Sequence, residues 1–321
     1  MEDAAPRSGS YEVEIPADGL TLAGTLELPQ EANGTGVVFI HGSGPNGRDE
    51  TLPAQLNMVF PRPVALFEEI AAGLSEAGIA SLRYDKRSCG PFNGCADNGY
   101  PFPDADISVD DFIADAETAA LWLLEQPEVT TVFLIGHSQG GTFVPIVLDR
   151  NDSLAGGILL AAPYFTIDQQ LRDQAEFSRE FAARAGLEES AIEAAIGPLD
   201  ALAAAVSEIK SDSYSGPDPG GLSVGFWTTW IDRSEEAASV VPTLDRPLLI
   251  VSGDYDWNVP VSETEAWRAA TDQADHRIVV LPCLTHAFNC VSEPDPLEIT
   301  PADVGRNVDA ALFDELVEFL R

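Results

Sequence analysis

The stretch Val132-Phe133-Leu134-Ile135-Gly136-His137-Ser138-Gln139-Gly140-Gly141 joins an apolar run to the pattern Gly-x-Ser-x-Gly. The run favours a β-strand, and residues 139–149 place apolar side chains on one face of a helix. A serine on so sharp a strand-to-helix turn has a strained backbone, and its hydroxyl stands clear of the sheet. The turn demands minimal side chains two residues to either side, which Gly136 and Gly140 supply. The stretch therefore predicts a nucleophile at Ser138.

Strand-like and helical segments alternate along most of the chain from about residue 36. The expected strands are 11–15, 20–28, 37–40, 79–84, the run before Ser138, 156–161, 247–252 and 277–281. The expected helices are 64–77, 109–125, 139–149, 262–273 and 302–321. This alternation is typical of an α/β fold, in which a mostly parallel central sheet carries helices on both faces, here after an opening antiparallel pair.

Residues 163–244 interrupt the alternation with several helical patterns and a loop rich in Gly, Pro and Ser. We expect them to form a helical cap inserted into a core made of residues 11–162 and 245–321. A second irregular stretch, 85–106, is rich in Gly, Pro and Asn and is expected to be an ordered loop near the carboxyl edge of the sheet.

The composition bounds the function classes. The chain has 321 residues, 45% of them hydrophobic, and a formal net charge of −36, which fits one large domain with an insertion and a solvated acidic surface. So much negative charge argues against nucleic acid or an anionic membrane as a partner. We find no apolar stretch of the roughly 18 residues that a membrane span needs.

The four cysteines fall in two local pairs, Cys89 with Cys95 and Cys283 with Cys290. Four cysteines permit three connectivities, and this clustering favours the two short loops. Disulfides at both would place the protein outside the cytoplasm, in the periplasm or secreted, whereas free thiols would fit the cytoplasm. The first ten residues are polar and lack the apolar core of an export signal. The spacing within each pair is wider than in a zinc site, so we predict no metal.

A serine nucleophile needs a base, and the chain has four histidines. His41 follows the first buried strand, His137 lies inside the turn and is expected to point away from the serine, and His276 precedes a strand among charged residues. His286 remains, in a loop after the last expected strand, where the carboxyl ends of strands gather to make sites. We therefore expect His286 to be the base.

The base in turn needs an acid that orients it. Asp254 and Asp256 both follow an expected strand and Gly253. Asp256 lies deeper in the turn and is the preferred candidate, whereas Asp254 is expected to cap the turn.

An acyl-transfer oxyanion needs two backbone N–H donors. We expect one from Gln139, directly after the nucleophile, and the other from Ser43 in the loop His41-Gly-Ser-Gly-Pro45. A phosphate-binding loop is the alternative for this segment, but the glycine spacing differs and no Lys-Ser/Thr follows.

Six short motifs together resemble the α/β-hydrolase superfamily, and within it the bacterial esterase and serine-aminopeptidase-like group, over about residues 11–321. They are His41-Gly-Ser-Gly-Pro45, Arg48-Asp-Glu-Thr51, Leu82-Arg-Tyr-Asp-Lys-Arg87, Gly136-His-Ser-Gln-Gly140, Gly253-Asp-Tyr-Asp256 and Thr285-His-Ala-Phe288. The chain order Ser138, Asp256, His286 is the order that this resemblance implies. This chain departs from the pattern of that group at two places, the Cys89–Cys95 stretch after Arg87 and the cysteines around His286. Both places lie beside the expected pocket.

Two further groups of residues carry alternatives. Arg48, Asp49, Asp85 and Arg87 are expected to form a structural ion-pair network, with substrate contact as the second reading. The aromatics Phe226, Trp227, Trp230 and Trp257 either line an apolar acyl or aryl pocket or pack the cap onto the core.

The expected function is a serine carboxylesterase that hydrolyses short-chain or aryl esters through an acyl-enzyme, with no metal or organic cofactor and a small-molecule ester as its partner. An aminopeptidase or amidase of the same fold is the first alternative, for which Glu188, Glu189 and Glu193 offer carboxylates to a free amine. An inactive hydrolase that serves as a binding protein is the second. The sequence leaves the oligomeric state open.

Overall fold

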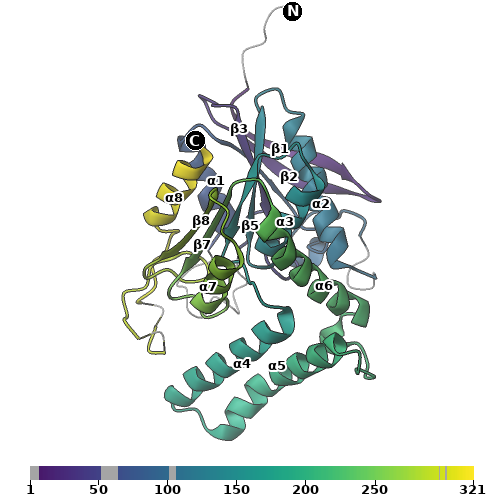
Figure 1. Ribbon diagram of the computed structural model, residues 1–321, viewed down its shortest axis with the longest axis vertical. Helices are drawn as coiled ribbons and strands as arrows, with labels where there is room; N and C mark the ends of the chain where they lie inside the picture. The colour runs from purple at the N-terminus through teal and green to yellow at the C-terminus, as the bar shows by residue number, and fades with distance from the viewer. Residues whose placement is uncertain (1–6, 52–63, 101–105, 296, 301) are drawn as a thin grey trace, which may run out of the picture.

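An eight-stranded sheet runs through the centre of the molecule (Figure 1). The computed structural model describes residues 7–51, 64–100, 106–295, 297–300 and 302–321. The strands are β1 (Gly9–Ala17), β2 (Leu20–Leu28), β3 (Thr35–Ile40), β4 (Ala80–Tyr84), β5 (Thr131–His137), β6 (Gly156–Leu160), β7 (Leu248–Gly253) and β8 (His276–Leu281). Their order in the sheet is β1-β2-β4-β3-β5-β6-β7-β8.

The sheet is mostly parallel. β1 and β2 form the expected antiparallel pair, and β2 is also antiparallel to β4, whereas the strands from β4 to β8 are parallel to one another. Most central strands are buried on both faces, as their nearly continuous apolar sequences require. The α/β fold class expected from the sequence is confirmed.

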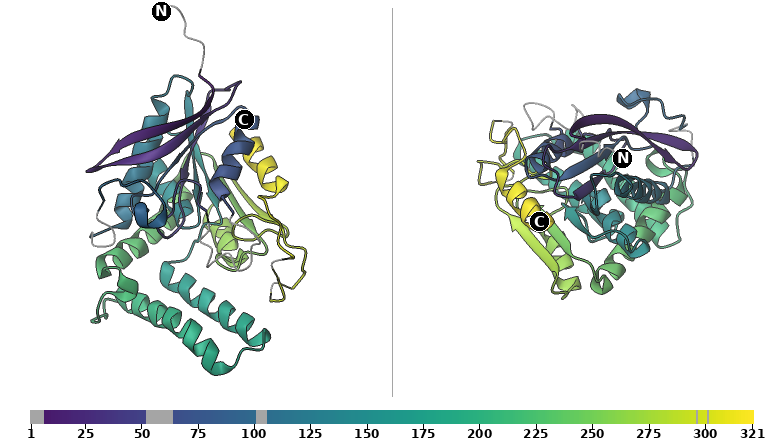
Figure 2. Two further views of the ribbon diagram at one scale, coloured as in Figure 1. Left: turned by 180° about the vertical axis from the view of Figure 1, so that it is seen from behind. Right: turned by 90° about the horizontal axis from the view of Figure 1, so that it is seen from above.

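Helices cover the two faces of the sheet. The helices α1 (Leu66–Glu76) and α8 (Ala310–Leu320) lie on one face, where they pack on Val37 and Phe39 of β3. The helices α2 (Val109–Leu124), α3 (Gln139–Arg150) and α7 (Val261–Ala270) contribute to the core on the other face, which takes Val38 and Ile40 of the same strand. Figure 2 shows α8 and α1 together on one side of the sheet. The alternation of side chains along β3 thus divides the hydrophobic core into two layers.

The insertion between β6 and β7 holds α4 (Ile167–Arg184), α5 (Glu189–Lys210) and α6 (Val224–Val240), with short 3-10 turns at Pro219–Gly221 and Val241–Thr243. Another 3-10 turn, Pro91–Asn93, lies in the irregular stretch after β4, of which residues 101–105 are outside the described part. The pair α4 and α5 extends away from the sheet, while α6 packs its buried aromatic face against the core (Figure 1).

Helix α5 departs from the expectation that no apolar stretch reaches membrane-spanning length. In the described part of the chain it is the one helix that is long and apolar enough to cross a membrane, by length and composition alone. Alanines contribute much of this apolar composition, and the large side chains of Ile192, Ile196, Val206 and Ile209 are buried in the protein. The helix is therefore amphipathic in its packing.

The last helix begins later than expected. The sequence predicted a helix over 302–321, but α8 starts at Ala310, and the Asp309 side chain caps it by accepting from the Ala311 N–H at 2.9 Å. The residues before it pair with the loop that follows β8: the Gly305 N–H donates to Cys290 O at 2.7 Å, and the Asp309 N–H donates to Phe288 O at 2.9 Å. These tertiary hydrogen bonds hold 303–309 in an irregular path of turn, bridge and bends, and they exclude helix there.

Candidate active site

Ser138 lies on a sharp turn between β5 and α3. Its backbone has φ 52° and ψ −123°, a strained conformation for a residue with a side chain. A Cβ added at Gly136 would lie 2.2 Å from Gly140 O, and one added at Gly140 would lie 2.1 Å from Ile40 O. Both glycines are therefore required by close backbone approach, as the sequence predicted. Ser138 is half-buried, while the residues beside it are buried.

Asp256 and His286 meet at the ends of β7 and β8. The Asp256 Oδ2 atom lies 2.7 Å from His286 Nδ1, and its Oδ1 accepts the N–H groups of Asn258 and Val259, each at 2.9 Å. One carboxylate oxygen is thus fixed by the backbone and the other is aimed at the imidazole. Asp254 is exposed and its N–H donates to Leu281 O, so Asp256 is the carboxylate that reaches the histidine.

His286 lies beside the serine turn through its contacts with His137, the residue before Ser138. The His137 Nε2 atom is 2.9 Å from the His286 carbonyl oxygen, and the two ring centroids are 4.6 Å apart. The His286 side chain keeps 17% of its surface exposed, so solvent or a substrate has access to it. The structure therefore brings Ser138, Asp256 and His286 to one end of three parallel strands.

His137 has a place that the sequence did not indicate. Its Nδ1 forms an ion pair at 3.2 Å with Glu50 Oε1, and both side chains are buried. Burial would lower the pKa of His137, but Glu50 and the His286 carbonyl raise it above its usual value. Burial would likewise raise the pKa of Glu50, but His137 and the Gly42 N–H hold it below its usual value. Each side chain of this buried pair therefore favours the charged form of the other.

The loop after β3 lies against the serine. A Cβ added at Gly42 would be 3.3 Å from the Ser138 Cβ, so the peptide between Gly42 and Ser43 borders the nucleophile. The Gly42 N–H donates to Glu50 Oε1 at 2.6 Å, and the Gly42 carbonyl accepts from Lys86 Nζ at 2.8 Å. Gln139 is the first residue of α3, where a helix leaves its N–H groups without internal partners. Of the two expected oxyanion donors, Gln139 therefore lies at the serine turn, and Ser43 directly follows the glycine that borders Ser138.

Lys86 is the second residue whose importance the sequence did not reveal. It is 3% exposed, its ammonium also donates to Gln139 Oε1 at 3.2 Å, and it lies 4.1 Å from the centroid of the Phe112 ring. Burial lowers its pKa to about 7. One signal was present: the chain has only two lysines, and this one directly follows a buried strand.

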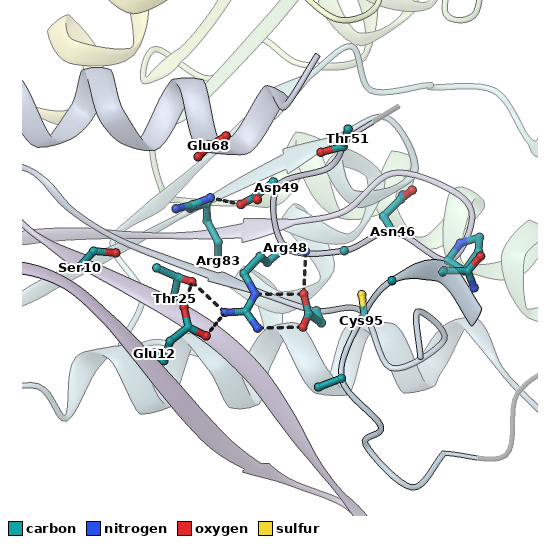
Figure 3. A pocket seen from close by; sticks show the side chains of 16 residues that line it. Ser10, Glu12, Thr25, Asn46, Arg48, Asp49, Thr51, Glu68, Arg83 and Cys95 are labelled. Carbon is teal, nitrogen blue, oxygen red and sulfur yellow. Dashed lines mark hydrogen bonds and ion pairs between the residues drawn. The ribbon is translucent and has the colours of Figure 1, made fainter. Parts of the chain in front are cut away.

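The charged residues near the sheet end pair with one another. Arg48 binds Asp85 through two nitrogens, at 3.1 and 2.9 Å, and Arg83 pairs with Asp49. Figure 3 shows these pairs in the wall of a cavity of about 840 Å³ between β1, β2 and the loop 45–51. None of Ser138, Asp256 and His286 is among the described residues that line it.

Arg87 makes a separate buried pair with Asp115, at 2.8 and 2.7 Å. All four charged residues singled out in the sequence are therefore engaged in ion pairs, although they belong to separate groups. This arrangement agrees with the expectation that these residues form structural ion pairs.

Both expected disulfides are present, Cys89–Cys95 and Cys283–Cys290. The second closes the loop that carries His286, inside which the Thr285 N–H donates to Asn289 O at 2.9 Å. The first lies against the loop after β3, since a Cβ added at Gly47 would be 3.2 Å from the Cys95 sulfur. Each disulfide thus braces one of the loops beside the serine turn.

The aromatic residues of the insertion are packed. Trp227 and Trp230 are buried and stack with their centroids 5.7 Å apart, and the Trp227 Nε1–H donates to Pro219 O at 3.0 Å. Trp257, next to Asp256, stacks on Phe177 of α4 at 5.8 Å. The contacts of Trp227 and Trp230 match packing of the insertion onto the core.

The acidic residues proposed for an amine-binding site are exposed. Glu188 and Glu189 lie at the start of α5, and Glu193 pairs with Arg179 at 3.2 Å. Within the residues that the structure describes, no group of three or more His, Cys, Asp or Glu side chains is arranged to hold a metal ion.

Known proteins resemble this chain in sequence and in fold. A family model described as serine aminopeptidase, S33, matches residues 63–295. Esterase EstD of Thermotoga maritima is 27% identical over 315 residues, which cover 96% of this chain and 67% of that protein. Est1E of Butyrivibrio proteoclasticus, solved with ferulic acid bound, has a TM-score of 0.57 at 20% identity, covering 96% of this chain and 97% of that chain. The Pyrococcus furiosus esterase Pf2001 has a TM-score of 0.54 at 16% identity, covering 98% and 90%. The two structural likenesses show a shared fold.

Proposed function

The chain belongs to the serine aminopeptidase S33 family of the α/β-hydrolases, and within that family we propose that it is a serine carboxylesterase. One arrangement supports this function above all: the Asp256 carboxylate lies 2.7 Å from His286 Nδ1 beside the strained turn that carries Ser138. A carboxylate that orients an imidazole beside a serine hydroxyl is the arrangement that acyl transfer through a covalent intermediate requires. The relative EstD, whose name is that of an esterase, supports the same reaction class.

In the first half-reaction, Ser138 Oγ attacks the ester carbonyl while His286 Nε2 takes the hydroxyl proton. Asp256 accepts from His286 Nδ1–H and stabilises the imidazolium that forms. The N–H groups of Ser43 and Gln139 bind the oxyanion of the tetrahedral intermediate. Collapse of that intermediate breaks the bond to the alcohol oxygen, which leaves with the proton from His286, and the acyl group stays on Ser138.

In the second half-reaction, water attacks the acyl-enzyme as His286 takes one of its protons. The new tetrahedral intermediate expels Ser138 Oγ, which recovers the proton from His286, and the carboxylic acid is released. These residues alone carry every proton and bond change of the cycle.

The insertion 163–244 serves in this proposal as a cap that bounds the ester pocket. Helix α4 touches the acid loop through Phe177, which stacks on Trp257, and through Gln174, whose Nε2–H donates to Asn258 O at 3.1 Å. We propose that a cap seated beside the acid restricts the acyl group in size, and hence that the substrates are short-chain or aryl esters. Est1E holds ferulic acid, an aryl acid, in a protein of the same fold.

An aminopeptidase is the second candidate, because the description of the family names that activity. Such an enzyme needs a carboxylate beside the site to hold the substrate's free amine. Three exposed glutamates on α5 are the candidates for holding that amine: Glu188, Glu189 and Glu193. Glu193 already pairs with Arg179, so these residues favour the esterase.

The two disulfides support a further part of the proposal, a periplasmic or secreted location.

Turnover of p-nitrophenyl acetate, butyrate and octanoate, compared with that of aminoacyl p-nitroanilides, tests the proposal. We expect turnover to be fastest on the short esters and Ser138→Ala to lower it about 10³-fold or more. Ser153→Ala, at an exposed serine, is the matched control and should leave the rate unchanged. Faster turnover of the anilides than of the esters would favour the aminopeptidase. Full activity of Ser138→Ala, or failure of the protein to react with a fluorophosphonate probe, would overturn the serine mechanism.

A further inference from the structure

Gly42, beside the nucleophile, has its N–H and its carbonyl held by two buried charged groups, one acidic and one basic. The Gly42 N–H donates to the Glu50 carboxylate at 2.6 Å, and the Gly42 carbonyl accepts from the Lys86 ammonium at 2.8 Å. Glu50 and Lys86 are each 3% exposed. Neither charge can reach a substrate directly, so each acts through the backbone that it holds.

Lys86 contacts Gln139 and the carbonyl of the peptide that supplies the Ser43 N–H. Besides the carbonyl of the Gly42–Ser43 peptide, it binds Gln139 Oε1 at 3.2 Å. An ammonium has only donors, so the amide oxygen of Gln139 must be the atom that faces it. The Phe112 ring, 4.1 Å away, occupies a third side of the ammonium. Lys86 thus ties the loop after β3 to the first residue of α3.

We propose that Lys86 is the positioning residue of the oxyanion hole, acting through the Gly42–Ser43 peptide and through Gln139. The inference rests on the proposed acyl-transfer function. The C=O and N–H of a trans peptide point in opposite directions. A cation fixed on Gly42 O therefore aims the Ser43 N–H away from Lys86. It also draws electron density toward the carbonyl oxygen, which makes that N–H a stronger donor to a developing negative charge.

Opposing influences act on the charge of Lys86. Burial lowers its pKa to about 7, whereas Glu50 and Asp115 favour the ammonium, and nearby His41, whose pKa burial lowers to about 4, adds no competing positive charge near neutral pH. Arg87 and Asp85 are each paired elsewhere, with Asp115 and Arg48. A buried ammonium is costly to a fold, and an apolar side chain of similar shape often serves stability as well. A catalytic use for the charge accounts for its place here.

The test compares Lys86→Met, which removes the donors and the charge at similar length, with Lys86→Gln, which keeps a neutral donor. Lys210→Met is the matched control, because Lys210 is the other lysine and bonds to Thr166 in the insertion. We expect Lys86→Met to lower kcat on p-nitrophenyl butyrate about 10²-fold with KM nearly unchanged, since the lost stabilisation belongs to the transition state. The kcat of Lys86→Gln should lie between that of Lys86→Met and that of the wild type.

A second readout separates positioning from general structural damage. An alkyl boronic acid forms a tetrahedral adduct with the serine and places an oxyanion in the hole, so its inhibition constant should weaken in step with kcat. Thermal unfolding of each variant checks the fold, and Lys86→Gln carries the test if Lys86→Met does not fold.

The possible outcomes separate the two proposals. Values of kcat and boronate affinity within about threefold of wild type in the folded Lys86 variants, or an equal loss in Lys210→Met, would overturn the role of Lys86. Absence of Ser138-dependent turnover in the wild type would instead overturn the proposed function itself.

Discussion

The serine side of the candidate site and its histidine side are held in place by different means. Ser138 is fixed by the close approach of backbones at Gly136 and Gly140, directly after the buried end of β5. His286 lies in a loop closed by the Cys283–Cys290 disulfide and fastened by hydrogen bonds from residues 303–309. Steric constraint sets the nucleophile, whereas covalent and long-range links set the base.

The difference explains how each side should respond to damage. A constraint made by packing fails when one atom is added, because the neighbouring backbone has nowhere to move. A loop held by several links fails by degrees, because each link supplies only part of the positioning. Three predictions follow this contrast from the largest expected effect on turnover to the smallest.

Gly140→Ala should break the serine side outright. Its new Cβ would lie 2.1 Å from Ile40 O, a backbone atom of a central strand, so the turn must shift. We expect unfolding in urea to show a loss of about 3 kcal/mol or more and ester turnover to fall at least 100-fold. Gly225→Ala is the control, since its nearest neighbour would be Ser223 Oγ at 3.7 Å, and it should keep both properties. A Gly140→Ala protein with normal stability would contradict the steric account.

Removing each disulfide should separate positioning from stability. The two bridges span similar separations, 6 and 7 residues, so replacing either pair with serine should cost about 2 kcal/mol. Replacing the pair around His286 should also lower ester turnover about tenfold, because the base loses one restraint. Replacing the Cys89–Cys95 pair should lower turnover less. Urea unfolding and initial rates check both variants. Equal losses of turnover would show that the histidine loop does not depend on its bridge.

The pH dependence of stability should report on Glu263, whose Oε2 accepts the N–H groups of Tyr164 and Phe165, each at 2.7 Å. Burial raises its pKa to about 7 from 4.5, so the folded state holds this proton more tightly than the unfolded chain. Its contribution to stability is complete below pH 4.5 and is lost as the pH rises to about 7, with a slope of at most about 1.4 kcal/mol per pH unit.

Urea unfolding between pH 4.5 and 8 measures the slope of the free energy of unfolding against pH. The substitution Glu263→Gln should remove this slope and change ester turnover little. Glu50→Gln on the serine side is the counterpart, because the pKa of Glu50 lies below its usual value and its contribution is lost as the pH falls. An unchanged slope in Glu263→Gln would assign the effect to another group.

The serine side was also the easier one to predict. The turn at Ser138 needs glycine at fixed positions within five residues, and this local requirement is visible in the sequence. The sequence likewise favoured Asp256 over Asp254, and the geometry agrees, because distance from the end of a strand decides which carboxylate turns inward.

What the sequence did not indicate depends on contacts between distant segments. Lys86, Glu50 and His137 belong to three separate segments, and their burial as a charged network follows only from the folded sheet. The predicted start of the last helix, residue 302, was eight residues too early, because α8 begins at Ala310. The residues before Ala310 bond to the histidine loop and do not extend the helix. Helical periodicity carries no information about such competing partners.

The segment 303–309 also determines when the site can form during synthesis. Chains fold from the N-terminus as they emerge from the ribosome. Ser138, the loop after β3 and Lys86 are all made well before Gly305 and Asp309, whose N–H groups fasten the His286 loop. The proposed nucleophile is therefore synthesised well before the segment that fastens its base, and the complete arrangement can assemble only after that segment has been made.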